Sequence, residues 1–109
     1  MAGRLERGEI RLFRFARPDK QRPVLILTRD STLQYLTRVT VAPITSTIRS
    51  VPSEVALGPD DGMRQPCAVN LHSLVTVSRK DVGKRLGRLS SARVREVCAA
   101  LDFALGCDD

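Results

Sequence analysis

The chain has 109 residues, a formal net charge of +6 and a hydrophobic content of 42 %. This length predicts one domain spanning residues 1–109, because two domains would each be too small for a stable hydrophobic core. The composition excludes a disordered chain, and no run of about 20 apolar residues exists to span a membrane.

The positive charge comes mainly from arginine, with 15 Arg against 3 Lys. Arginine pairs bidentately with phosphate, so the excess is typical of a nucleic-acid partner, but a GC-rich genome would produce it too. Residues 1–54 hold ten cations and five anions, whereas residues 55–109 hold eight and seven. We therefore expect the first half to build most of any surface that binds a polyanion.

Two strands are predicted near the N-terminus. Residues 9–15 are predicted to form the first strand, with apolar and charged side chains on both faces. The charged segment 16–20 has the composition of a turn and ends this strand. Residues 23–28 form a continuous apolar run, which is typical of a central strand that is buried on both faces. Pro23 is tolerated there because it occupies the first position of the strand.

A short helical turn and two further strands follow. Residues 30–35 begin with an Asp and a Ser that can cap such a turn. Residues 39–45 alternate well enough for a third strand, in which Pro43 indicates a bulge or a sheet edge. Residues 54–57 predict a fourth strand, and the turn at 58–62 closes it with two Asp that we expect to be solvated.

The next segments are less regular. Residues 67–71 and 74–77 predict one fifth strand with a kink between them. Residues 83–88 resemble a phosphate loop only superficially, because the Walker pattern requires its Lys to follow a different Gly. We predict a basic, solvated turn there.

The last segment is predicted to be an amphipathic helix. A Ser at position 90 or 91 can cap its start, and Gly106 supplies a stop. Its apolar residues follow helical spacing along one stripe, namely Val94, Val97, Cys98, Leu101 and Leu105. The fold class is therefore mainly β with α: a strongly bent small sheet or open barrel with one helix packed across it.

Cysteine and histidine usage argues against a metal site. His72 is the sole histidine, and the three cysteines at positions 67, 98 and 107 lack the paired spacing of zinc ligands. The odd cysteine count and the absence of a signal peptide predict reduced thiols in the cytoplasm. Cys98 is expected to be a core residue on the apolar stripe.

Two features could bind a phosphate group. Arg22 lies at the mouth of the apolar strand, where Pro23 favours an extended backbone, so it fits either a phosphate ligand or a surface arginine. The hydroxyl cluster of residues 45–47 could donate to phosphate oxygens or satisfy its own backbone. Neither feature decides the function alone.

Three short motifs occur together in the order and spacing of a known family. They are RGEI at residues 7–10, QRPVLIL at residues 21–27 and VAPITS at residues 41–46. With these motifs the chain resembles the MazF/PemK-type toxins of bacterial type II toxin–antitoxin systems, from Arg7 to the terminal helix. The resemblance implies a small SH3-like β-barrel of the CcdB/MazF kind with a C-terminal helix.

The resemblance also implies an activity. Such toxins are homodimers that cut single-stranded RNA at short sequences, without metal or cofactor, through a 2′,3′-cyclic phosphate. A cognate antitoxin silences them by filling the RNA groove, and operator DNA is bound only through the antitoxin complex. The family's catalytic pair corresponds to Arg22 and Thr45 in this sequence.

Further RNA contacts are expected around this pair. The expected RNA-binding residues are Lys20, Gln21, Ser46, Thr47, Arg49, His72 and Ser73. His72 could contact RNA or assist proton transfer, or it could be purely structural. The loop before Arg22 is shorter than in many family members. The family's frequent Gln-Leu/Ile-Arg segment appears here as Ser73-Leu74-Val75, which removes a basic contact, so the preferred RNA sequence stays open.

A different class of function also fits the expected fold. A CcdB-like toxin would bind DNA gyrase and cut nothing, and a small RNA-binding barrel without activity is a third possibility. The Arg-Pro and Pro-Ile-Thr motifs favour the nuclease, because a gyrase-binding toxin does not need them. The chain has only four aromatic residues, which argues against a base-stacking platform of the usual kind.

Overall fold

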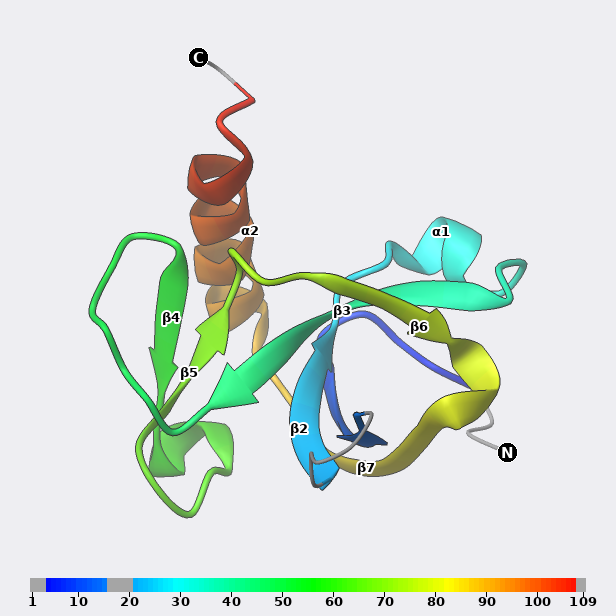
Figure 1. The fold of residues 1–109 in the computed structure, drawn as a ribbon, viewed down its shortest axis with the longest axis horizontal. Coiled ribbons are helices and arrows are strands. Elements are labelled where there is room, and N and C mark those ends of the chain that lie inside the picture. Colours follow the sequence, from blue (N-terminus) through cyan, green and yellow to red (C-terminus); the bar gives the residue numbers. More distant parts are fainter. Residues whose placement is uncertain (1–3, 16–20, 108–109) are drawn as a thin grey trace.

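The structure is a computed structural model that describes residues 4–15 and 21–107. Within them, seven antiparallel strands form one bent sheet, and a helix packs on it (Figure 1). The strands are β1 (Glu9–Arg14), β2 (Gln21–Ile26), β3 (Arg38–Thr45), β4 (Glu54–Leu57), β5 (Cys67–Asn70), β6 (Val75–Ser78) and β7 (Val82–Arg88). The helices are α1 (Asp30–Leu33) and α2 (Ser91–Leu105), with 3-10 turns at Pro59–Asp61 and Arg79–Asp81.

Strand β3 organises the sheet. The strand order is β4-β5-β3-β2-β1-β7, and β6 pairs with the first half of β3 while β5 pairs with its end. Pro43 lies between these two pairings and opposite Val24 of β2, so it marks the switch between two partner strands rather than a sheet edge. The predicted mainly-β fold with a C-terminal helix is confirmed, although the sheet does not close into a barrel.

The central strand β2 is buried on both faces, as its continuous apolar run predicts. Val24 and Ile26 belong to one hydrophobic cluster, whereas Leu25 belongs to another. None of the three side chains is more than 1 % exposed. Alternate residues of a strand point to opposite faces, so this short segment connects both halves of the core.

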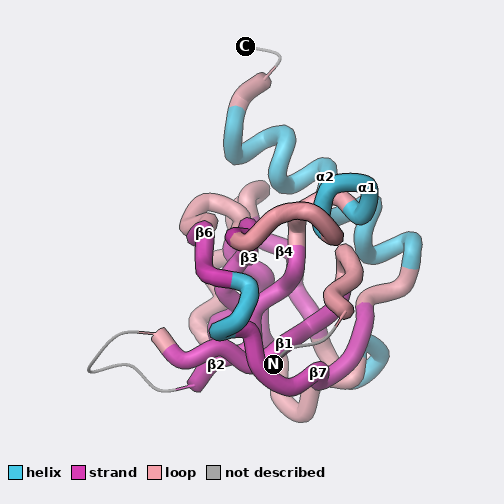
Figure 2. Tube along the Cα trace, turned by 90° about the vertical axis from the view of Figure 1, so that its right-hand side faces the viewer, coloured by secondary structure: helices cyan, strands magenta, loops and turns pink. Residues whose placement is uncertain are grey.

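Helix α2 has the predicted ends. The Ser90 hydroxyl accepts a hydrogen bond from the Arg93 backbone N–H at 3.2 Å, and Gly106 follows the last turn. The helix packs against β4, and its C-terminal end projects beyond the strands in both views (Figures 1 and 2). Leu105 is consequently 61 % exposed, and Cys98 is half-buried beside the Arg7 guanidinium rather than in the core.

Two predicted segments differ from the structure. The expected kinked fifth strand is two strands, β5 and β6, which pair with different parts of β3. Residues 82–88 are not a solvated turn but the strand β7, which pairs with β1 at one end of the sheet. Lys84, Arg85 and Leu86 in the middle of this strand are all exposed, so the apolar alternation typical of a half-buried strand is missing. Glycine at position 83 suits the close approach of β7 to β1, because a Cβ there would lie 3.0 Å from the Leu12 carbonyl oxygen.

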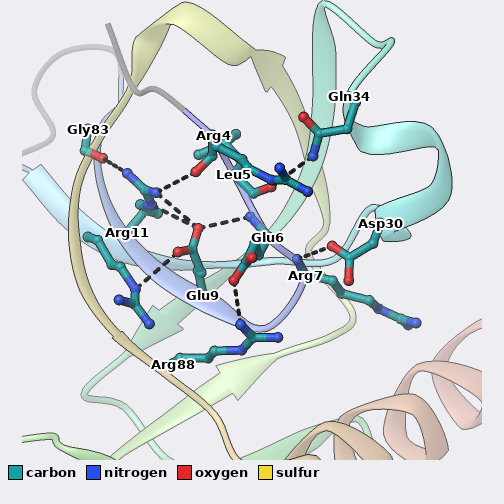
Figure 3. A network of polar contacts seen from close by, with 11 residues as sticks. Arg4, Leu5, Glu6, Arg7, Glu9, Arg11, Asp30, Gln34, Gly83 and Arg88 are labelled. Atoms are coloured by element: carbon teal, nitrogen blue, oxygen red, sulfur yellow. Dashed lines mark hydrogen bonds and ion pairs between the residues drawn. The ribbon is translucent and has the colours of Figure 1, made fainter.

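A buried ionic network fastens β1 to β7 and to the N-terminal segment (Figure 3). Glu9 is 4 % exposed, and its carboxylate accepts hydrogen bonds from Arg11 and from the Glu6 backbone N–H. The other carboxylate oxygen lies 3.0 Å from Arg85 Nε. Arg11, 6 % exposed, also donates to the carbonyls of Gly83 and Arg4.

No helix among the described residues is long and apolar enough to cross a membrane.

Candidate functional site

A cleft of about 780 Å³ opens where β2 and β5 begin and β3 ends. The loop between β4 and β5 forms one wall, and one residue of β7 contributes to another. The lining residues are Ile10, Gln21, Arg22, Pro23, Ile44, Thr45, Ser46, Asp61, Gly62, Met63, Arg64, Gln65, Pro66, Cys67 and Leu86. The cleft thus draws on both halves of the chain, not mainly on the more basic first half.

The cleft brings Arg22 and Thr45 together. The β2–β3 ladder ends where Val24 pairs with Pro43, two residues from Arg22 on one strand and two residues from Thr45 on the other, and both residues line the cleft. On its other side, Arg22 pairs with Phe13 of β1, so its backbone is fixed from a neighbouring strand. The sheet therefore positions a guanidinium and a hydroxyl in one concave surface.

The Thr45 hydroxyl is oriented by its own chain. Its Oγ1 accepts a hydrogen bond from the Thr47 backbone N–H at 3.1 Å. A hydroxyl has one hydrogen to donate and can accept through its lone pairs. Because the Thr47 amide uses an acceptor position, the hydroxyl hydrogen remains available for an oxygen in the cleft.

The segment after Thr45 is held by a carboxylate. Glu54 Oε1 accepts the backbone N–H groups of Arg49 and Ser50 at 2.9 and 3.0 Å. Ser50 has a φ of +57°, which is unfavourable for a residue with a side chain and is maintained here by these contacts. The irregular segment that follows β3 is therefore held in a defined conformation.

The other expected RNA-binding residues are distributed unevenly. Gln21 and Ser46 line the cleft, whereas Thr47 and Arg49 come after Ser46 in the chain and are not lining residues. Lys20 lies outside the described residues.

His72 and Ser73 are likewise absent from the cleft lining. They follow β5 at the end opposite Cys67, and His72 Nδ1 is hydrogen-bonded to the Ser53 hydroxyl. Their contact with RNA stays a prediction.

The loop at residues 62–66 is anchored to helix α2 by an ion pair. Arg93 donates from Nε and Nη2 to the two carboxylate oxygens of Asp61, at 3.0 and 3.1 Å. Asp61 also accepts the Gly58 backbone N–H at 3.0 Å, and its side chain is 6 % exposed, so it is not the solvated residue expected from sequence. Gly62 follows with a φ of +83°, a conformation that favours glycine.

The hydrogen bonds from Arg93 lower the pKa of Asp61 below its ordinary value of 3.8. The pair therefore stabilises the fold fully above that value, and the contribution is lost as the pH falls through the lowered pKa of the folded protein. We expect Asp61→Asn to lower the free energy of unfolding between pH 5 and 8, and this difference from the wild type to shrink below about pH 3.8. Urea unfolding at several pH values measures it, with exposed Asp60→Asn as control. A difference that does not change with pH would contradict the ion pair.

Leu86 reaches the cleft because β7 is bulged. Ile10 pairs with Gly87 while Arg11 pairs with Arg85, so Leu86 is the extra residue in the ladder. A bulge redirects a side chain and is common beside functional sites. Leu86 is 46 % exposed and adds apolar surface to the cleft.

The described residues contain no group of three or more His, Cys, Asp or Glu that could hold a metal ion. Cys67 lies in the cleft lining, and burial, with a smaller effect of nearby Asp61, raises the pKa of its thiol. The thiol is therefore less readily ionised than an exposed one.

Comparisons with known proteins match almost the whole chain. A family model described as "PemK-like, MazF-like toxin of type II toxin-antitoxin system" matches residues 6–105. The Mycobacterium tuberculosis protein named "Probable endoribonuclease MazF5" is 46 % identical over 88 residues, covering 80 % of this chain and 81 % of that protein. Endoribonuclease MazF3 of the same species is 37 % identical and covers 91 % and 96 %.

Solved structures agree with these sequence matches. The Mycobacterium tuberculosis toxin MazF-mt6 superposes with a TM-score of 0.82 at 36 % identity, covering 90 % of this chain and 96 % of that chain. An endoribonuclease from a mycobacterial species, solved in complex with its cognate antitoxin, gives a TM-score of 0.85 at 26 % identity, with 95 % and 97 % covered.

Proposed function

Because this chain belongs to the PemK-like, MazF-like toxins of type II toxin–antitoxin systems, we propose that it is an endoribonuclease that cuts single-stranded RNA in the cleft lined by Arg22 and Thr45. The observation that carries the proposed site is the meeting of this guanidinium and this hydroxyl in one cleft. The relatives named above as endoribonucleases, which match most of the chain, support the activity.

The proposed reaction is an internal transesterification. The ribose 2′-oxygen forms a bond to the adjacent phosphorus and loses its proton, while the bond from phosphorus to the 5′-oxygen breaks and that oxygen gains a proton. The products are a 2′,3′-cyclic phosphate and a 5′-hydroxyl. Atoms and charge balance without a metal ion or a cofactor.

Arg22 and Thr45 would act on the charge that develops in this reaction. Negative charge concentrates on the non-bridging phosphate oxygens in the transition state, and fixed donors stabilise it. Arg22 provides a permanently charged fork that suits phosphate. Thr45 provides one neutral donor, oriented by the Thr47 amide.

The activity is tested by incubating the purified protein with a mixed RNA pool in the presence of EDTA and mapping new 5′-hydroxyl ends. We expect new ends that share a short sequence, and the same ends without EDTA. No cleavage in either condition would refute the nuclease, and cleavage only without EDTA would refute metal independence.

Thr45 is tested by two substitutions of similar size. Thr45→Val removes the hydroxyl and is expected to slow single-turnover cleavage about 10- to 100-fold, because a hydrogen bond to a charged group contributes about 1.5–3 kcal/mol. Thr45→Ser retains the hydroxyl and should remain within a few-fold of the wild-type rate. Equal rates for the two variants would exclude a role for the hydroxyl.

Partners follow from the same proposal. The mycobacterial endoribonuclease solved with its cognate antitoxin supports a dedicated antitoxin for this chain as well. We expect the antitoxin to compete with RNA for the cleft, and the free toxin to be a homodimer, as the resemblance implies. Sedimentation of the purified chain measures the second expectation.

A further inference from the structure

The cleft is larger and chemically more varied than the Arg22–Thr45 pair requires. Its volume of about 780 Å³ lies within the range of about 300–1,000 Å³ that is typical of small-molecule pockets. Beside the phosphate-binding pair, it has an apolar part that includes Pro23, Met63 and Leu86. A flat, partly apolar group next to the scissile phosphate would fit such a surface.

The wall formed by residues 62–66 carries two side chains suited to such a group. Arg64 and Gln65 are exposed and line the cleft, and neither side chain has a hydrogen bond or an ion pair within the described part of the chain. Arginine pairs bidentately with guanine and glutamine with adenine, through the purine N7 edge. In single-stranded RNA these base edges are open to a protein.

The position of this wall is fixed from outside the cleft. Arg93 of α2 holds both carboxylate oxygens of Asp61, which directly precedes the wall. Arg93 itself sits in the first turn of α2, where its backbone N–H is bound by the Ser90 hydroxyl. The ion pair therefore connects the start of the C-terminal helix to the wall of the cleft.

We propose that Arg64 and Gln65 recognise a purine base next to the scissile phosphate, and that Arg93 positions their loop through Asp61. This inference rests on the proposed function, since it assumes that RNA occupies the cleft. Arg64 and Gln65 determine specificity by touching the base. Arg93 is a positioning residue, because it touches the loop and not the RNA.

Base recognition is measured by binding, so the test does not depend on cleavage. The probes are pairs of short RNA oligonucleotides with a 2′-deoxy nucleotide at the mapped cleavage position, which prevents cleavage. If no cleavage position is found, the 2′-deoxy nucleotide is placed at each position in turn. The two members of a pair differ only in the neighbouring base, which is a purine in one and a pyrimidine in the other. We expect the wild type to bind the purine oligonucleotide about fivefold or more tightly, and Arg64→Ala or Gln65→Ala to reduce that ratio towards one. Arg95→Ala, which removes an equal charge from an exposed position on α2, should leave the ratio unchanged.

The positioning role has its own matched pair of variants. Arg93→Ala breaks the contact with Asp61, whereas Ser90→Ala weakens the same helix start without touching Asp61. Both should lower Tm, but only Arg93→Ala should reduce the purine-to-pyrimidine ratio. Partial unfolding lowers the amount of active protein equally for both oligonucleotides, so it cannot change their ratio.

The outcomes separate the inference from the proposed function. A ratio near one in the wild type, or an unchanged ratio in both Arg64→Ala and Gln65→Ala, overturns the base-recognition proposal even if RNA is cut. An equal change of the ratio in Ser90→Ala and Arg93→Ala overturns the positioning role. Purine-selective binding without any cleavage would support the subsite while refuting the nuclease.

Discussion

Replacing Arg22 with alanine is expected to slow RNA cleavage about 10²- to 10³-fold, because it removes one preorganised donor from the transition state. The side chain is exposed at the start of β2, so its loss should leave the core and the Tm essentially unchanged. Single-turnover rates on an oligonucleotide with one cleavage site measure the effect on the chemical step alone.

Two further arginine substitutions show whether the shape of the guanidinium or only its charge is needed. Arg22→Lys keeps the positive charge but loses the planar fork, so we expect a rate between those of the wild type and Arg22→Ala. Arg95→Ala removes the same charge from α2, away from the cleft, and should cleave at the wild-type rate. Equal rate losses in Arg95→Ala and Arg22→Ala would mean that only net charge matters.

Removing the buried carboxylate of Glu9 is expected to have the largest effect on stability. Glu9→Ala removes the carboxylate that accepts hydrogen bonds from Nε and Nη2 of the buried Arg11, and breaking a buried ion pair typically costs about 3–5 kcal/mol. It also releases the contact with Arg85 on β7. Urea unfolding measures the loss, which should appear as a lower midpoint at an unchanged slope.

Two comparisons show whether burial is the cause. Glu6→Ala breaks the pair with Arg88, in which both side chains are about half exposed, and should cost at most about 1 kcal/mol. The double variant Glu9→Ala/Arg11→Met removes both buried charges and should recover part of the stability lost in Glu9→Ala. Equal losses in Glu6→Ala and Glu9→Ala would contradict the account of the network.

The fold was predictable wherever burial leaves a pattern in the sequence. The sequence predicts β2 because a strand buried on both faces needs a continuous apolar run. It predicts α2 because a helix buried on one face needs apolar residues at helical spacing, and a Ser before the first turn indicates where the helix starts. Strand β7 has no such pattern, because it lies at an end of the sheet and its central residues, two of them charged, are exposed. Its bulge at Leu86 depends on pairing with β1, which a single sequence does not display.

The candidate site was predictable only in part, for a similar reason. Arg22 and Thr45 belong to short motifs within adjacent strands, so the resemblance could single them out. Asp61 and Arg93 are 32 residues apart, and only the packing of α2 beside the loop brings them together. Arg64 and Gln65 line the cleft a few residues after Asp61, although nothing in their local sequence distinguishes them from a surface turn.

A crystal structure with a bound substrate analogue would show whether RNA is cut between Arg22 and Thr45. The analogue is an RNA oligonucleotide with a 2′-deoxy nucleotide at the mapped cleavage position, which prevents the reaction. We expect oxygens of the scissile phosphate to lie about 3 Å from both the Arg22 guanidinium and Thr45 Oγ1. A scissile phosphate bound away from both side chains would refute the proposed site.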